Sequence, residues 1–167
     1  MLKNAYSYEE EINKTYLSLI NKNPEYLKYY FHSCFYENKL YTKAEDTWGA
    51  LSYVSIHEDK LLGFVEALIK RPEGYIESLK LINFTEKTNF YFSKDIKDFI
   101  DKLFFDYDYY KITFCVVVGN PAEKTYDKLI KLYQGKVSGY FTKNVKLIDG
   151  KLYDVKHYEI FKGLQNE

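Results

Sequence analysis

The sequence predicts an α+β fold, in which helices cover a mixed, mostly antiparallel sheet. Short β-rich segments separated by turn residues occupy the middle and the end of the chain, and such segments are typical of hairpins. Apolar residues at helical spacing lie before and between them. No internal repeat, linker or low-complexity segment interrupts this order, so we expect a single domain over residues 1–167.

The composition excludes several classes of function. The chain is 46% hydrophobic and 19% aromatic, which suits a packed core and argues against disorder. Its 24 basic and 24 acidic side chains give no net charge, and Arg71 is its single arginine. Arginine is the usual reader of phosphate and guanine. We therefore expect no nucleic-acid partner.

The apolar segments and the cysteines bear on the location. The longest apolar run is far too short to span a bilayer, and "MLKNAYSYEEE" does not resemble a signal peptide. Cys34 and Cys115 suggest no disulfide framework. His32 and Cys34 share no partner pair, so we expect no metal site. These features predict a cytoplasmic protein without a membrane partner.

Residues 1–45 are predicted to form a pair of helices. Ser7 followed by Glu10 matches a capping box, and apolar residues then recur at helical spacing as far as Ile20. Asn23-Pro24 marks the start of a second helix.

Residues 46–92 are predicted to form an antiparallel meander. We expect strands near 49–57, 61–70 and 75–84. Glu58-Asp59-Lys60 separates the first two, and a Pro-Gly-containing turn separates the second from the third.

Residues 93–167 are predicted to form a helix, a strand, a second helix and a hairpin. Ser93 is the expected cap of the amphipathic segment "SKDIKDFIDKLFF". "KITFCVVV" is continuously apolar, as a central strand is. Asn120-Pro121 begins the second helix, Gly135 ends it, and Asp149-Gly150 is the two-residue turn of the last hairpin.

This order of elements resembles the GNAT N-acetyltransferase superfamily. "SIHEDKLLGFVEALI" looks like the second and third strands of that family, with Gly63 at a usual glycine position. "KITFCVVVGNPA" looks like its fifth strand and the asparagine that follows. The C-terminal segment, with Gly139, Asp154 and Tyr158, is similar to the hairpin of the ribosomal-protein N-acetyltransferase branch.

The resemblance implies a fold and a reaction. We expect six to seven strands and about four helices, with the strands at 75–84 and 111–118 splayed into a V. Acetyl-CoA would enter that V and give its acetyl group to a primary amine, either of a small molecule or of a protein N-terminus. The amine must lose a proton as it attacks, so a base or a chain of waters takes it. The chain could also pair with a second copy as a homodimer.

The resemblance also implies residues that bind the cofactor. Val117, Val118 and Asn120 end the fifth strand, where relatives contact the cofactor, although Asn120 also suffices as a helix cap. On the opposite wall the corresponding positions are Phe92, Ser93 and Lys94, where Ser93 is equally well explained as a plain cap.

Two catalytic roles follow from the same resemblance. Many relatives carry a tyrosine that protonates the departing thiolate, for which Tyr126 is the candidate and Tyr133 the alternative. A carboxylate that guides the proton of the amine falls at Glu77, with Glu66 as the alternative. A buried core tyrosine and a solvated strand glutamate are the plainer interpretations. His57 and His157 fit structural or exposed positions better than catalytic ones.

One segment departs from the family pattern. Relatives hold the pyrophosphate with a glycine-rich loop before the third helix, whereas the loop "NFTEKTNFYFSKDI" contains no glycine. Glycines allow the backbone to approach phosphate oxygens closely. Phe90, Tyr91 and Phe92 stand there instead and would fill the cleft. The alternative function is therefore a catalytically inactive GNAT-fold module for binding or assembly.

Overall fold

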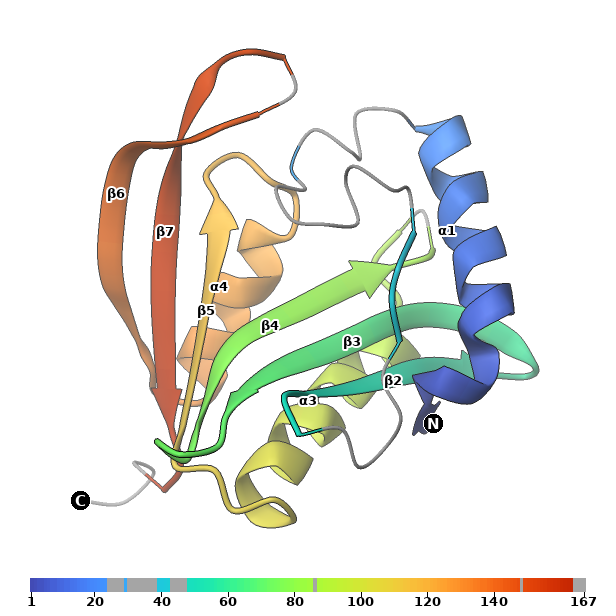
Figure 1. Ribbon diagram of the computed structural model, residues 1–167, viewed down its shortest axis with the longest axis horizontal. Helices are drawn as coiled ribbons and strands as arrows, with labels where there is room; N and C mark the ends of the chain where they lie inside the picture. The colour runs from blue at the N-terminus through green and yellow to red at the C-terminus, as the bar shows by residue number, and fades with distance from the viewer. Residues whose placement is uncertain (24–28, 30–38, 43–47, 86, 148, 164–167) are drawn as a thin grey trace.

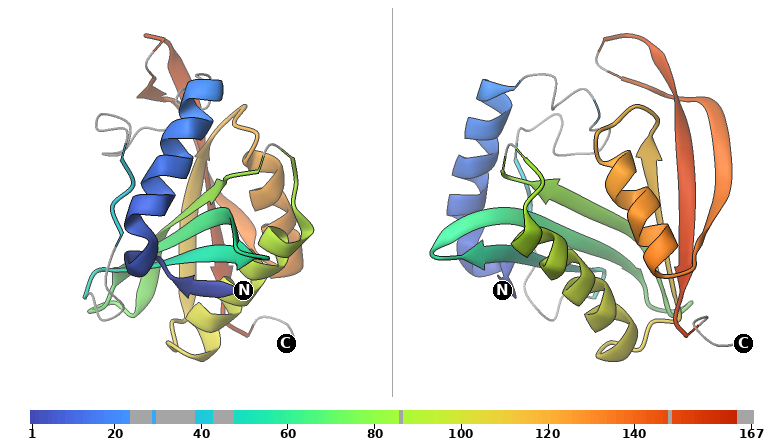
Figure 2. Two further views of the ribbon diagram at one scale, coloured as in Figure 1. Left: turned by 90° about the vertical axis from the view of Figure 1, so that its right-hand side faces the viewer. Right: turned by 180° about the vertical axis from the view of Figure 1, so that it is seen from behind.

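The computed structural model of the protein describes residues 1–23, 29, 39–42, 48–85, 87–147 and 149–163. A seven-stranded sheet carries α1 on one face and α3 and α4 on the other (Figures 1 and 2). The elements are β1 Leu2–Asn4, η1 Ala5–Tyr8, α1 Glu9–Lys22, β2 Ala50–His57, β3 Lys60–Lys70, β4 Tyr75–Asn83, α3 Phe90–Phe105, β5 Lys111–Val117, α4 Glu123–Leu132, β6 Lys136–Lys146 and β7 Leu152–Phe161. Apart from Tyr29, the predicted second helix at 24–37, with Cys34, lies outside the described residues.

The strand order is β1-β2-β3-β4-β5-β7-β6. Every neighbouring pair is antiparallel except β4 and β5, which are parallel. The predicted meander is confirmed within one residue at each end. The predicted fold class, an α+β domain with a mixed, mostly antiparallel sheet, is confirmed as well. The described part of the chain has three α-helices, slightly fewer than expected, and none of them is long and apolar enough to cross a membrane.

The N-terminal residues differ from the prediction. Leu2–Asn4 pair with β2 as an edge strand, and a 3-10 turn separates them from α1. Asn4 caps that turn by accepting a hydrogen bond from the Tyr6 amide, whereas the N-cap of α1 is Tyr8. The capping box at Ser7 is therefore wrong. The inward face of α1 is as predicted, with Ile12, Tyr16 and Ile20 buried.

The start of α3 also differs from the prediction. The helix begins at Phe90, and its cap is Asn89, whose side chain accepts a hydrogen bond from the Phe92 amide. Ser93 is already inside the helix, where its hydroxyl donates to the Asn89 carbonyl. Phe90, Tyr91 and Phe92 are thus the first turn of α3 and not part of a loop.

The last third of the chain follows the prediction with two changes. The positive φ that ends α4 belongs to Gln134 at 50°, and Gly135 is instead needed because a Cβ there would lie 2.4 Å from Ile160. The β6–β7 connection is longer than two residues: the Leu147 amide donates to the Lys151 carbonyl, and Gly150 has a φ of +76° within it.

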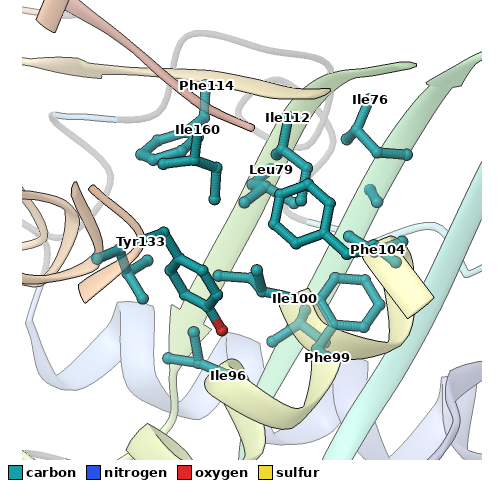
Figure 3. Close-up of a cluster of buried hydrophobic side chains, with 14 of the residues drawn as sticks. Ile76, Leu79, Ile96, Phe99, Ile100, Phe104, Ile112, Phe114, Tyr133 and Ile160 are labelled. Carbon is teal, nitrogen blue, oxygen red and sulfur yellow. The ribbon is translucent and has the colours of Figure 1, made fainter. Parts of the chain in front are cut away.

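The two faces of the sheet bury separate apolar clusters. On one face, α3 and α4 cover residues of β3, β4, β5 and β7; Figure 3 shows Phe99 and Ile100 of α3 and Tyr133, just after α4, converging on Leu79 and Phe114. On the other face, Ile12 and Tyr16 of α1 cover Val54, Phe64 and Ile82. The sheet is thus the middle of three layers, and side chains of β2, β3 and β4 alternate between the two clusters.

Candidate active site

β4 and β5 separate almost as soon as they meet. Their register contains one pair, Ile76 with Ile112, whereas β5 and β7 share seven. Beyond that pair the strands diverge into a V (Figure 1). The Thr113 hydroxyl lies at the vertex and donates to the carbonyls of Ile76 (3.1 Å) and Glu77 (2.8 Å). The Thr113 side chain thus satisfies β4 carbonyls that would bond to β5 amides if the two strands stayed paired.

The β4 arm offers backbone groups to the opening. The Phe84 amide donates to the Leu62 carbonyl of β3, so residues of even number on this part of β4 direct their polar groups at β3. Backbone direction alternates along a strand, which turns the groups of Leu79 and Leu81 toward the opening. An amide in such a position can polarise a carbonyl held in the V.

The face of the V that carries α3 and α4 is apolar, and both candidate tyrosines lie on it. Tyr126 is buried, with its ring 5.1 Å from Phe114 and 6.1 Å from Tyr158. The Tyr133 hydroxyl instead donates to Asp101 of α3 (2.8 Å). Burial, with Asp101 second, raises the pKa of Tyr133 well above its usual range. Tyr126 therefore lies against β5, whereas Tyr133 belongs to the packing of α4 on α3.

The opposite face of the V carries polar side chains beside two apolar clusters, and we call it the polar face. Ile112, Phe114 and Val116 join the cluster under α3 and α4, so strand alternation places Thr113 and Cys115 on the α1 side. Across the opening, Lys80 of β4 pairs with the buried Glu66 of β3 at 2.8 Å.

The two candidate glutamates differ in their surroundings. Glu66 lies on the polar face of the V, with its carboxylate buried against Lys80. Glu77 is exposed next to the vertex and forms a surface ion pair with Lys70 at 3.4 Å. Of the two, Glu66 is the buried one, and it lies on the α1 side of the V.

The end of β5 is a closed turn with its amides already partnered. Val117 is buried with Leu147 and Val155, and the Val118 amide donates to the Asp154 carbonyl. Asn120 Oδ1 accepts a hydrogen bond from the Ala122 amide, so Asn120 closes the turn before α4, which begins at Glu123 and not at Pro121.

Glu123 ties this turn to β7. Its carboxylate accepts a hydrogen bond from the Gly119 amide and also lies 3.3 Å from Lys156 Nζ. Lys156 pairs with Asp127 at 2.7 Å, and Asp127 accepts a hydrogen bond from Tyr158. These contacts hold α4 against β7 and fix the position of the β5 arm.

The first turn of α3 is the segment that the resemblance assigns to the other wall of the V. Phe90 and Tyr91 are 76% and 46% exposed, and Tyr91 stacks on His57 at 3.6 Å. Phe92 is buried against Gly63 of β3. The expectation that all three aromatic side chains fill the cleft is therefore wrong, because two of them point outward. Lys94 pairs with Asp98, and the Ser93 hydroxyl is 2.9 Å from the Asn89 carbonyl.

Sequence reasoning missed two residues around the V: Thr113 at the vertex and Lys80 beside Glu66. Strand alternation around "KITFCVVV" and "ESLKLIN" could have found Thr113 and Lys80, because both are polar residues within otherwise apolar strands.

Comparisons with known proteins identify the fold. No model of a known protein family matches the chain, and no curated protein sequence matches it. Among solved structures, a spermidine N-acetyltransferase from Vibrio cholerae in complex with CoA and spermine superposes with a TM-score of 0.72, at 21% identity over 97% of this chain and 95% of that chain. A mutant of the spermidine N-acetyltransferase from the same organism gives 0.69, at 21% identity over 97% and 93%.

A third structure, of mutant forms of the spermidine/spermine N-acetyltransferase of Vibrio cholerae, gives a TM-score of 0.68 at 20% identity over 92% of this chain and 90% of that chain. The chain therefore has the fold of GNAT N-acetyltransferases, as its resemblance predicted. At these identities the likeness establishes the fold alone.

Proposed function

We propose that this protein is an acetyl-CoA-dependent N-acetyltransferase that acts on a primary amine. The observation that carries the proposal is the V between β4 and β5, with a single register pair at its vertex. Backbone N–H and C=O groups that are left unpaired cost free energy. Two neighbouring strands are therefore expected to stay hydrogen-bonded along their length unless a ligand occupies the space between them. The structural neighbours with this fold are N-acetyltransferases, one of them in complex with CoA and spermine.

The residues around the V suit a thioester cofactor. The amides of Leu79 and Leu81, which face the opening, would polarise the thioester carbonyl. At the N-terminus of α3, Asn89 occupies the Phe92 amide, and the described residues offer no acceptor for the amides of Phe90 and Tyr91. These two amides, with the positive end of the helix dipole, are the groups that would hold the pyrophosphate. Since neither requires glycine, the departure from the family loop is compatible with binding.

The assignments at the β5 wall follow the same proposal. Val117 and Val118 would line the pantetheine arm, while Asn120 would keep the turn closed beside it. Tyr126 is our candidate for the acid that protonates the thiolate, because it packs against β5 next to the V. Glu77 points to solvent beside the vertex, so Glu66 is the better placed carboxylate.

The acceptor is proposed as an amine on a small molecule or on a protein N-terminus. The structural neighbours are named for spermidine and spermine, which are polyamines. Among the residues that the structure describes, the polar face of the V carries the ion pair of Lys80 with Glu66, whose charges cancel. Such a face favours an acceptor that presents one amine over one with several positive charges.

A ligand-binding measurement tests the cofactor. Acetyl-CoA at one hundred times its Kd should stabilise the native state by about 2.7 kcal/mol and raise its melting temperature. Acetyl-pantetheine is the matched control, because it has the thioester but no pyrophosphate, and its effect should be smaller.

A turnover assay tests the reaction. Thiol release from acetyl-CoA should depend on an added amine, and spermidine should be compared with a monoamine and with a peptide that has a free N-terminus. Absence of any thermal shift at millimolar acetyl-CoA would overturn the proposal. It would favour an inactive module, for which the glycine-free segment before α3 is the supporting observation.

A further inference from the structure

A histidine lies on the polar face of the V, one strand away from its β5 arm. His157 of β7 is the register partner of Cys115 of β5. Cys115 faces the α1 side, and directly opposed residues in an antiparallel pair share a face, so His157 faces that side too. Neighbouring strands lie about 4.8 Å apart, which brings the imidazole within reach of an amine held over β5, directly or through one water.

The surroundings leave the imidazole with its nitrogens available. Phe141 of β6 contacts it edge-on, with ring centroids 4.8 Å apart. That ring folds back over Gly139, the register partner of His157, where a Cβ would lie 2.7 Å from it. In the described part of the chain, His157 makes this ring contact and no hydrogen bond or ion pair.

The groups that face His157 do not favour the protonated, positively charged form of its imidazole. Cys115 lies across from it on β5, and burial raises the pKa of that thiol, so it is neutral. Glu159, two residues along β7, is held by Lys136 at 3.0 Å. Tyr29 packs on the adjacent cluster of Val117 and Val155. Burial lowers the pKa of His157, which leaves the imidazole neutral and able to accept a proton near pH 7.

We propose that His157 is the general base of the N-acetyl transfer, a catalytic residue on the polar face of the V. The inference rests on the proposed function. The neutral amine attacks the thioester carbonyl carbon, and a C–N bond forms. The nitrogen becomes acidic and gives one proton to the imidazole as the C–S bond breaks and its electron pair leaves with sulfur. The thiolate takes a proton from Tyr126, which regains one from solvent, while the imidazolium gives its proton to solvent, so the products are the amide and the CoA thiol.

Glu66 is the competing proton acceptor on the same face. Its carboxylate lies 2.8 Å from Lys80 Nζ, and protonating it would break a buried ion pair. Removing one partner of such a pair is strongly unfavourable. His157 has no such partner to lose, which is why the geometry favours it over Glu66.

The test compares two histidine substitutions. His157→Gln should lower kcat by 100-fold or more, leave the thermal shift with acetyl-CoA unchanged, and remove the acid limb of the pH profile of kcat/KM. Asp106→Asn is the control, because Asp106 lies at the end of α3 opposite to Phe90 and forms a surface ion pair with Lys102 at 3.2 Å, and its kinetics should match the wild type. His157→Asn is the second variant, with the same expected loss.

Two outcomes contradict the inference, and they can be distinguished. If the wild type turns over and His157→Gln keeps its rate within threefold with the same acid limb, His157 is not the base and the proposed function stands. If the wild type neither binds acetyl-CoA nor releases thiol, the proposed function fails and the inference fails with it. NMR titration of the His157 imidazole gives a readout independent of turnover: a pKa below 6.5 is expected, and a charged imidazole at pH 7 would overturn the proposal.

Discussion

Gly63 shows how one missing side chain decides where α3 lies. A Cβ at this position would be 2.4 Å from two ring carbons of Phe92 and 2.7 Å from the Ile82 carbonyl oxygen. The ring can move, but the carbonyl belongs to the backbone of β4. The glycine therefore allows the first turn of α3 to pack on β3, which sets the wall of the candidate site.

Gly63→Ala should destabilise the protein by about 1–3 kcal/mol, the usual cost of overpacking a core. Urea unfolding measures the change. Gly49→Ala is the matched control, since a Cβ at Gly49 meets nothing within 4 Å, and its unfolding midpoint should stay close to that of the wild type. Equal midpoints for the two variants would contradict this role for Gly63.

The identity of site residues was predictable from the sequence only in part. Asn120 was expected to cap a helix and to sit at the β5 wall, and it closes the turn before α4. Tyr126 and Tyr133 are seven residues apart on one helical stripe, so spacing could not separate them. Only the packing of α4 shows that Tyr133 reaches Asp101 of α3 while Tyr126 lies against β5.

At the scale of elements, the β2–β3 turn is built from residues that its backbone disfavours. Glu58 and Asp59 have φ angles of 48° and 59°, the left-handed conformation that costs an L-residue roughly 1–2 kcal/mol. Two consecutive residues of this kind form the turn whose favoured sequence is Asn-Gly. The turn is held by the pairing of β2 with β3 rather than by its own preferences.

The double variant Glu58→Asn/Asp59→Gly should therefore stabilise the protein by about 1 kcal/mol or more. The expected result is a higher midpoint of thermal unfolding with unchanged cofactor binding, because the turn takes no part in the V. A lower midpoint would show that the side chains of Glu58 and Asp59 contribute more than their backbone conformation costs.

The errors in element boundaries have a common physical cause. Ser93 and Asn89 are both good N-caps, and the choice between them depends on Phe92 reaching Gly63, a contact between distant parts of the chain. β1 is three residues long and exists through its pairing with β2. Local patterns predicted the helices and strands that bury an apolar face, and they could not predict ends that are set by tertiary contacts.

At the scale of the molecule, the site arises from topology. The V follows from one parallel junction in an otherwise antiparallel sheet, and the polar face combines Lys80, Thr113 and His157 from three separate strands. Composition and periodicity predicted the strands themselves. The resemblance to a family predicted the V, and only the register of β5 with β7 revealed His157.

The titratable groups of the whole molecule predict how its stability depends on pH. Below the ordinary pKa of histidine, 6.5, the unfolded chain binds a proton that the native state resists at His157, whose pKa burial lowers. At Asp127, burial works to raise the pKa, but hydrogen bonds from Lys156 and Tyr158 outweigh it and hold the pKa below 3.8. At Asp154, the Lys143 amide and the Tyr140 hydroxyl likewise hold the pKa below 3.8.

The histidine and the two aspartates change the stability in the same direction. Below the ordinary pKa of each group the unfolded state binds more protons than the native state, so the free energy of unfolding falls as the pH falls. In alkali the sign reverses. Burial, against the opposing effect of Lys156, raises the pKa of Tyr158 to about 12. Above pH 10 the unfolded chain loses a proton that the native state keeps, and stability falls again.

Urea unfolding from pH 3 to pH 11 should therefore give a free energy of unfolding that declines first below pH 6.5, more steeply below pH 4, and again above pH 10. His157→Gln should remove the first decline and keep the second, whereas Asp127→Asn should weaken the second and keep the first. A wild-type free energy that stays flat between pH 6.5 and pH 5 would show that His157 is as free to take up a proton in the native state as in the unfolded chain. That result would also weaken its assignment as a base that is neutral near pH 7.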